Sequence, residues 1–389
     1  MRVNINQHRS PTLSSAAFTI PTFSIWTLLY LFAWLSSSCV LTVSAWSPTW
    51  WSTVAQLSLR HAPATETMLL SAKPMCSKYP GLSPGQARIC ELFWDHMHVV
   101  SDGTRSAIEE CQHQFRNRRW NCSTPYGTGV FGPMHQLGTR EAGFTYAIVA
   151  AGVTYEISRA CRLGRLNSCG CNQEPRPENL NREWLWGGCG DNVHYGYQFS
   201  QNFIDIRERE RDFPKGTPEH GRSLMNRWNN EVGRKGIRRK ARVTCKCHGV
   251  SGSCNLKTCW KQSPTMREIG DLLVERYDDA VRVKVSRRGN LKLIKGAKKR
   301  RAAQMDLVYL DESPDYCKSD VGTGRVGTEG RVCNKNSSAS DSCDALCCGR
   351  GHHSFVHNET EQCQCKFVWC CQVQCKQCTK TVTIYSCRS

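Results

Sequence analysis

Cysteine content is the feature that most restricts how this chain can fold. The sequence has 25 Cys in 389 residues. Cytosolic thiols stay reduced, so such a count requires either metal sites or an oxidising compartment. Twelve cysteines lie between Cys76 and Cys259 and twelve between Cys317 and Cys387, whereas residues 260–316 have none. Even counts on both sides of a cysteine-free stretch predict two separately cross-linked domains.

The N-terminus predicts entry into the secretory pathway. The apolar residues 25–35 (IWTLLYLFAWL) are followed by serines and by residues 43–45 (VSA). A short apolar core before a small-residue cleavage site is typical of a signal peptide, here covering 1–45. A signal anchor is the alternative, because residues 25–43 approach the ~20 needed to span a bilayer. That longer run includes three serines and two threonines, which favours cleavage.

Cleavage after Ala45 removes one cysteine and leaves an even 24, as expected for a secreted disulfide framework. Residues 46–67 are rich in Ser, Thr and Pro, and we expect a disordered lead-in there. The protein is therefore predicted to pass through the endoplasmic reticulum to the extracellular space and matrix.

The first module carries helix signals. Residues 144–161 are Ala-rich and mostly apolar, which is long enough for a buried helix. Ser83-Pro84 followed by Gln86 is typical of a helix start. Residues 265–281 repeat apolar side chains along one helical face. These patterns predict a mainly helical N-terminal domain over 68–282.

The second module has too many cysteines for a conventional core. Residues 317–389 hold 12 Cys, a density typical of disulfide scaffolds, and their strand-forming residues predict short strands and hairpins. Residues 283–304 contain a turn signal and a basic run, and we expect a linker that is flexible or hairpin-like. The predicted fold class is α+β: a helical N-terminal domain and a small disulfide-rich β-hairpin domain over 305–389.

Several cysteine pairs have spacings that zinc sites also use, such as Cys245/Cys247 and Cys375/Cys378. The signal peptide argues for disulfides instead, as do three N-glycosylation sequons. We therefore expect structural disulfides, no bound metal and no cofactor. The sequon asparagines are Asn121, Asn336 and Asn358.

Cysteine spacing predicts a hairpin near the C-terminus. Pairing of Cys363 with Cys378 and of Cys365 with Cys375 would be concentric about residues 370–371, which places these two at the tip. Residues two apart on a strand share a face, so both pairs can cross-link the same side. The aromatic residues near the tip either fill a small core or form a contact surface. A tip held out by disulfides has little core to fill, which favours contact.

Nested pairing of Cys247 with Cys254 and of Cys245 with Cys259 would close a second small loop. These pairs are not concentric, so the strands need a bulge or an offset. Ser251 lies at the tip between glycines and is open to three interpretations: a plain turn serine, a modification site, or a hydrolase nucleophile. The nucleophile elbow needs a final glycine and a strand-to-helix turn, which makes the enzyme the weakest of the three.

Basic residues form two clusters, at 234–242 and 298–301, within a net charge of +19. Nucleic acid is one partner for such patches, but a secreted protein meets sulfated glycosaminoglycans instead. The alternative is a solvated basic face. The residues predicted to bind heparan sulfate are Arg234, Lys235, Arg238, Arg239, Lys240, Arg242, Lys298, Lys299, Arg300 and Arg301.

Four cysteine-anchored segments resemble signatures of the Wnt family. They are 111–122 (CQHQFRNRRWNC), 184–192 (WLWGGCGDN), 245–260 (CKCHGVSGSCNLKTCW) and 365–371 (CKFVWCC). The resemblance extends from about Met68 to the C-terminus. Residues 313–317 (SPDYC) and 347–351 (CCGRG), together with 184–192, are most similar to the fifth Wnt class.

The resemblance implies a secreted, lipid-modified glycoprotein that is a ligand and not an enzyme. It would bind the cysteine-rich domain of Frizzled receptors, with a co-receptor, and trigger signalling that includes β-catenin-independent output. A "thumb" (245–259) with palmitoleate on Ser251 and an "index finger" (363–378) would grip the receptor. Porcupine would add the lipid, Wntless would carry the protein during export, and the lipid would attach it to membranes. The finger residues implied to contact the receptor are Phe367, Val368, Trp369, Cys370, Cys371 and Val373.

The resemblance also implies the remaining disulfides. They are Cys111–Cys122, Cys161–Cys169, Cys171–Cys189, Cys317–Cys348, Cys333–Cys343, Cys347–Cys387 and a bridge between adjacent Cys370 and Cys371, which leaves Cys76 to pair with Cys90.

Two other classes of function remain open from the residues. One is a structural matrix glycoprotein that uses the same disulfides without receptor activity. The other is a secreted hydrolase that uses Ser251. A fatty acyl group on Ser251 supports the ligand, and hydrolysis lost in Ser251→Ala supports the enzyme.

Overall fold

The computed structural model describes residues 49–55, 73–123, 131–294, 302–320 and 325–389. All of them belong to one unit, Trp46–Ser389. The predicted signal peptide lies outside the described residues. No helix within these ranges is long and apolar enough to cross a membrane.

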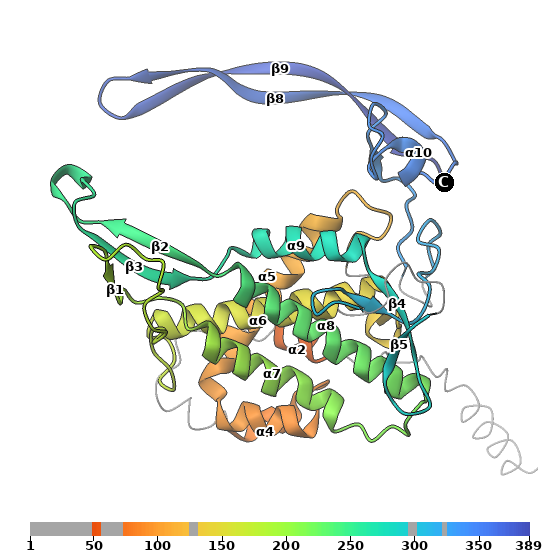
Figure 1. Cartoon of the computed structure of the whole chain (residues 1–389). Coiled ribbons are helices and arrows are strands. Elements are labelled where there is room, and N and C mark those ends of the chain that lie inside the picture. The colour runs from red at the N-terminus through yellow and green to blue at the C-terminus, as the bar shows by residue number, and fades with distance from the viewer. Residues whose placement is uncertain (1–48, 56–72, 124–130, 295–301, 321–324) are drawn as a thin grey trace, which may run out of the picture. The chain divides into compact units, whose positions relative to one another are not determined.

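A helical bundle forms the larger part of the described chain (Figure 1). Helix α6 is buried along most of its length and packs against α5, α7, α8 and α9. Helices α5 and α6 approach so closely at Gly103 and Gly152 that a Cβ atom on either would overlap the other backbone. The helices are α2 (Trp50–Ala55), η2 (Lys73–Lys78), α4 (Pro84–Leu92), η3 (Trp94–His96), α5 (Met97–Phe115), η4 (Gly132–Gln136), α6 (Arg140–Arg162), α7 (Val193–Arg209), α8 (Pro218–Lys240) and α9 (Met266–Asp278).

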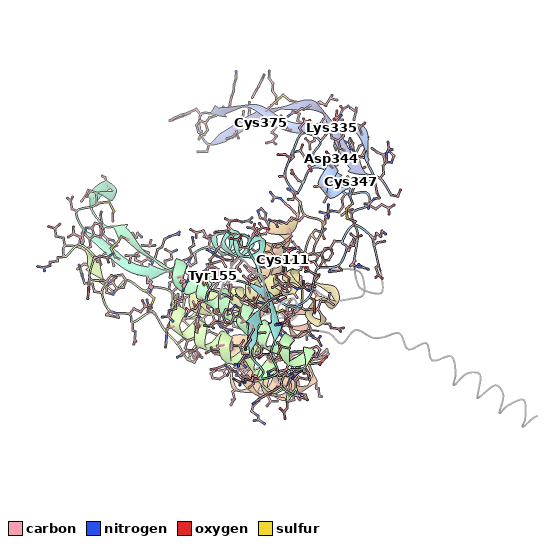
Figure 2. All side chains as sticks on the ribbon, turned by 45° about the vertical axis from the view of Figure 1, so that its right-hand side comes forward. Cys111, Tyr155, Lys335, Asp344, Cys347 and Cys375 are labelled. Carbon is pink, nitrogen blue, oxygen red and sulfur yellow. A yellow bond between two sulfur atoms is a disulfide. The ribbon has the colours of Figure 1, made fainter. Side chains whose placement is uncertain are left out.

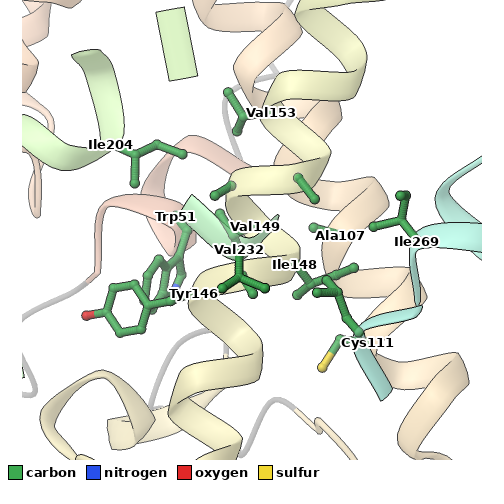
Figure 3. Close-up of a cluster of buried hydrophobic side chains, with 14 of the residues drawn as sticks. Trp51, Ala107, Cys111, Tyr146, Ile148, Val149, Val153, Ile204, Val232 and Ile269 are labelled. Atoms are coloured by element: carbon green, nitrogen blue, oxygen red, sulfur yellow. The ribbon is translucent and has the colours of Figure 1, made fainter. Parts of the chain in front are cut away.

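The core of the bundle is made of aliphatic and aromatic side chains from several helices. Figure 3 shows Ile148 of α6 near Ala107 of α5, Val232 of α8 and Ile269 of α9, all of which belong to one buried cluster. Local sequence also fixes where helices begin: Ser83 and Thr265 are N-caps of α4 and α9, each in a capping box. The helix start predicted at Ser83 is confirmed, and the helix predicted over 265–281 forms as α9 but ends at Asp278.

The disordered lead-in predicted for residues 46–67 is wrong for Trp50–Ala55, which forms α2. Trp50 and Trp51 are both 2 % exposed, and their rings pack edge-to-face on Phe203 and Tyr146. Burying an indole ring contributes roughly 4–6 kcal/mol before ordering costs. This burial outweighs the disorder suggested by the polar composition of the segment.

The predicted linker, 283–304, contains the hairpin that was one of its two expected forms, and this hairpin is part of a sheet that packs on the helical core. Strands β4 (Val281–Val285), β5 (Leu291–Leu293) and β6 (Val308–Tyr309) pair in the order β5-β4-β6. A turn joins the first two, with Ser286 N donating to Asn290 O at 2.9 Å. Leu307 and Val308 are buried in the helical core cluster, so the helical domain continues past its predicted end at residue 282.

The cysteine-rich module contains β7 (Val332–Cys333), α10 (Cys343–Leu346), β8 (His352–Val368) and β9 (Gln372–Cys387), with strand order β7-β9-β8. Its buried cluster consists of Leu346 and four disulfide-bonded cysteines of the pairs Cys333–Cys343 and Cys347–Cys387. Lys335, Asp344 and Cys347 mark this module in Figure 2. Disulfides thus replace most of the apolar core, and the predicted α+β fold class is confirmed.

Candidate functional site

The predicted thumb is a hairpin of β2 (Arg242–Cys247) and β3 (Lys257–Gln262) that extends beyond the helices (Figure 1). Cys245 lies opposite Cys259, and the two form a disulfide with Cα atoms 4.0 Å apart. Cys247 lies opposite Lys257 but bonds to Cys254, nearer the tip. Both predicted pairs form, and the loop outside the strand ladder absorbs the predicted offset.

Ser251 lies at the tip of this hairpin in the left-handed conformation, with φ 57° and ψ 27°. This region costs a non-glycine residue roughly 1–2 kcal/mol, so neighbouring contacts must hold it. Gly249 N donates to Ser253 O at 2.8 Å, and Gly252 N donates to Gly249 O at 3.0 Å. Gly252 has φ 76°, whereas a Cβ on Gly249 would overlap Ser253. The two glycines therefore permit the turn for different reasons.

The Ser251 side chain is exposed, and Val250 beside it is 90 % exposed. Its hydroxyl has no hydrogen bond to the part of the chain that the structure describes. Ser251 lies between antiparallel strands, not at the strand-to-helix turn of a nucleophile elbow. The geometry thus suits a turn serine or a modification site and does not suit a hydrolase.

The base of the thumb is attached on two sides. Strand β1 (Leu185–Trp186), which the sequence patterns did not reveal, pairs in parallel with β3, and the Lys257 ammonium lies 4.2 Å from the ring centroid of Trp184. On the other side, Arg242 forms an ion pair of 2.5 Å with Glu268 in the first turn of α9. The hydrogen bond from Arg242 lowers the pKa of Glu268 to about 2.

The predicted index finger is the outer part of a longer hairpin, because β8 and β9 pair from His352↔Cys387 to Val368↔Gln372. The disulfides Cys363–Cys378 and Cys365–Cys375 cross-link it as predicted. The register shifts between Cys363 and Lys366, where Gln364 has φ 47°. This β-bulge lets both disulfides close on one hairpin.

Apolar side chains gather at the tip of the index finger. Trp369 is 91 % exposed, and Phe367 and Val373, which lie opposite each other, are 69 % and 65 % exposed. Val368 is also exposed. These residues fill no core among the described residues, which leaves the contact surface of the two alternatives as a prediction. Exposed aromatic anchors of this kind carry binding energy in interfaces.

The bridge implied between Cys370 and Cys371 is wrong for this structure: both are free, exposed thiols. Adjacent Cα atoms lie about 3.8 Å apart across a trans peptide, below the roughly 4.4–6.8 Å usual for a disulfide. Both residues have positive φ, 73° and 78°. They lie in the turn at the finger tip without a disulfide between them.

The other implied disulfides are all present among the described residues. The sulfurs of Cys333, Cys347 and Cys387 lie within 4.8 Å of one another, but they belong to two disulfides and offer no thiolate to a metal. The implied disulfides that form are Cys76–Cys90, Cys111–Cys122, Cys161–Cys169, Cys171–Cys189, Cys317–Cys348, Cys333–Cys343 and Cys347–Cys387.

The sequon asparagines lie in different surroundings. Asn336 and Asn358 are exposed, and Asn121 is half-buried next to Cys122. The Asn121 side-chain carbonyl accepts a hydrogen bond from Ser123 N at 3.3 Å.

Heparan-sulfate binding by Arg234 is contradicted, because this side chain is fully buried. Its guanidinium donates to both oxygens of Asp205, at 2.8 and 3.2 Å, and pairs with Glu231 at 3.1 Å. The helix turns Arg234 inward, toward a partner on α7 that a local charge count does not reveal. Lys235 also pairs with Glu231, at 3.4 Å.

The other residues predicted to bind heparan sulfate fall into two groups. Arg238, Arg239 and Lys240 are exposed in the last turn of α8, and Arg242 is exposed although paired with Glu268. Lys298, Lys299, Arg300 and Arg301 lie outside the described residues.

The described residues thus form a disulfide-rich two-domain protein, with an exposed serine on one cross-linked hairpin and exposed apolar side chains on the other. The chain matches the model of the wnt family over residues 78–388. It belongs to the Wnt family, whose members are secreted signalling ligands and not enzymes.

Individual relatives cover nearly the whole chain. Protein Wnt-2 of Caenorhabditis elegans is 52 % identical over 95 % of this chain and 100 % of its own length. Protein Wnt-5b of Homo sapiens is 51 % identical over 93 % of this chain and 99 % of its own length, which confirms the resemblance to the fifth class. A chain in the structure of human WLS in complex with WNT8A is 37 % identical, with a TM-score of 0.52, over 75 % of this chain and 94 % of that chain.

Proposed function

We propose that this chain carries palmitoleate esterified to Ser251 and binds the cysteine-rich domain of Frizzled receptors through the tips of the thumb and the index finger. Together with a co-receptor, this contact triggers Wnt signalling that includes β-catenin-independent output. The observation that carries the proposal is Ser251 itself, exposed on a cross-linked tip in a backbone conformation that serine rarely adopts. Such outliers cluster at functional sites.

The energetics of the two tips support this proposal. Lipidation contributes ~0.8 kcal/mol per buried CH₂, so a C16 chain contributes on the order of 10 kcal/mol before ordering costs. The exposed Trp369 adds an aromatic anchor on the other tip. A lipid and a few apolar side chains are therefore sufficient for tight binding by two small surfaces.

The same lipid calls for a carrier, since a fatty chain does not diffuse freely in water. We propose that Porcupine acylates Ser251, that Wntless carries the acylated protein during export, and that the lipid afterwards attaches it to membranes. The likeness to a chain solved in the complex of human WLS with WNT8A supports this route.

Heparan sulfate is the proposed matrix partner. Arg238, Arg239 and Lys240 present exposed charge at the end of α8, and the sequence has a second basic cluster at Lys298–Arg301. Sulfated chains attract such clusters by charge.

A side-by-side comparison of Ser251→Ala and Ser253→Ala tests the proposal. Ser251→Ala should abolish acyl labelling, lower the secreted level and bind Frizzled far more weakly, because the largest apolar contact is missing. The fold should survive, since no described hydrogen bond depends on the lost hydroxyl. Ser253→Ala should be acylated normally, because Ser253 adjoins Cys254 and lies off the tip. Full labelling of Ser251→Ala, or loss confined to Ser253→Ala, would overturn the assignment.

A further inference from the structure

A cavity of about 330 Å³ is lined by described residues of 119–123, 131–137, 314–316 and 325–327. Trp120, Phe131 and Tyr316 form aromatic walls, and Arg119 and Gln136 bring polar groups to it. Apolar walls with a few polar groups are typical of sites for small ligands. Neither the lipid nor the receptor contact proposed above uses this cavity.

The asparagine of a sequon is part of the cavity wall. Asn121 lines it together with Ser123, the third residue of the same sequon. Ser123 N donates to the Asn121 side-chain carbonyl at 3.3 Å. The Asn121 amide nitrogen, where a glycan attaches, has no hydrogen bond to the described residues. A sugar linked to Asn121 would therefore begin at the cavity itself.

We propose that the cavity holds the first N-acetylglucosamine of a glycan on Asn121. A sugar ring has an apolar C–H face, which suits the rings of Trp120 and Tyr316, and oxygens that accept hydrogen bonds from donors such as the Arg119 guanidinium. Arg119 uses its Nε to donate to Ala345 O at 3.0 Å and keeps further N–H groups for a ligand. The volume lies near the lower end of the roughly 300–1,000 Å³ of small-ligand pockets, which suits one sugar residue with the rest of the glycan outside.

The attachment follows ordinary N-glycosylation in the endoplasmic reticulum. The donor is a lipid-linked oligosaccharide diphosphate. The Asn121 amide nitrogen bonds to C1 of the first sugar and loses a proton, and the lipid diphosphate leaves. No oxidant or reductant is needed.

The first sugar then stabilises the folded state by filling the cavity. One wall comes from residues just after α5 in the sequence, and the other from residues just before the cysteine-rich module. A covalently linked ligand stays at high effective concentration, so it stabilises the folded state without any supply from solution. Loss of the first sugar should loosen residues 314–320, whereas loss of the outer sugars should not.

Enzymatic release under native conditions tests the burial directly. Peptide N-glycosidase F must reach the bond between asparagine and the first sugar. On native protein, it should release the Asn121 glycan at least tenfold more slowly than the glycans of the exposed Asn336 and Asn358, and this difference should vanish on denatured protein. Equal native rates at Asn121 and the exposed sites, or an unmodified Asn121 peptide in secreted protein, would overturn the proposal.

Trimming tests the stabilisation. A variant with Asn336→Gln and Asn358→Gln, made in cells that attach only oligomannose glycans, carries its glycan on Asn121 alone. Endoglycosidase H leaves one N-acetylglucosamine, and this form should keep the thermal midpoint and the hydrogen-exchange protection of residues 314–320. Adding Asn121→Gln, which removes the glycan without adding charge, should lower both. A trimmed form as unstable as the Asn121→Gln form would contradict the proposal.

Discussion

Arg234 and Arg238 lie one helical turn apart on α8 and have opposite surroundings. Arg234 is buried against Asp205, whose other contact is a 2.9 Å hydrogen bond from Asn230, whereas Arg238 is exposed. A buried ion pair loses stability steeply when one partner is removed, because the other charge stays buried. The two arginines therefore differ in function although their local sequence is similar.

Replacing Arg234 should destabilise the fold without a specific effect on glycosaminoglycan binding. Arg234→Ala should lower the free energy of unfolding by about 3–5 kcal/mol, because it leaves the Asp205 carboxylate buried and unpaired. Arg238→Ala is the matched control and should stay within about 0.5 kcal/mol of the parent. Denaturant unfolding of the secreted proteins measures both.

If Arg234→Ala is not secreted, the double variant Asp205→Leu/Arg234→Met supplies a second measurement. It removes both charges and should restore part of the secreted level. Equal stability of Arg234→Ala and Arg238→Ala would contradict the buried pair.

At the scale of elements, the index finger separates binding from folding. Its two disulfides hold the hairpin, and its tip contributes no core. Substitutions at the tip should therefore affect partners and leave the fold intact.

Trp369→Ala should weaken Frizzled binding by roughly 1–4 kcal/mol, because an aromatic anchor is lost from the interface. Secretion should stay near normal, since the side chain is 91 % exposed. Val356→Ala, on the same hairpin but far from the tip in register, is the control and should bind as the parent does. Retention of the Trp369 variant inside cells would instead place Trp369 in a core.

The start of α9 should make stability depend on pH. The pKa of Glu268 is lowered to about 2, first by the Arg242 hydrogen bond and then by the capping contacts of Thr265, from about 4.3 in an unfolded chain. Its contribution is therefore fully present above about pH 4.3 and disappears as the pH falls toward 2. The thermal midpoint of Glu268→Gln should lie below that of the parent at pH 7, and the gap should close on acidification. A gap that stays constant with pH would contradict this role.

Sequence predicted those elements whose determinants are local. The apolar repeat over 265–281 predicted α9, and concentric cysteines predicted the finger. The bulge at Gln364 and the pairing of β1 with β3 depend on distant segments and were not foreseen. Two local signals were present but missed. The indoles of Trp50 and Trp51 indicated the buried helix α2, which the polar composition of its segment obscured. The alternation of Val and basic residues over Val281–Val285 indicated strand β4, which the basic charge of the segment obscured.

At the scale of the whole molecule, the helical domain and the cysteine-rich module are joined by arginine contacts. Arg331 donates to the carbonyls of Arg119 and Arg116, at 2.8 and 2.9 Å, just beyond the last turn of α5. Burial of Arg331 lowers its pKa. The module thus rests on backbone acceptors left open where the helix ends.

With a net charge of +19, the protein should bind heparin most strongly where exposed cations cluster. Neutralising Arg238, Arg239 and Lys240 together should lower the salt concentration that elutes the protein from heparin, because exposed charge is screened by salt. Neutralising Lys298–Arg301 alone, and then both clusters, shows how far each contributes. Unchanged elution of the combined variant would assign binding to other basic residues.

Acylation of Ser251 is best tested by the mass of the peptide containing residues 245–259 from secreted protein. The peptide should be heavier by one monounsaturated C16 acyl group, with fragmentation that assigns the group to Ser251 and leaves Ser253 unmodified. An unmodified Ser251 in secreted, receptor-active protein would show that receptor binding does not need the acyl group.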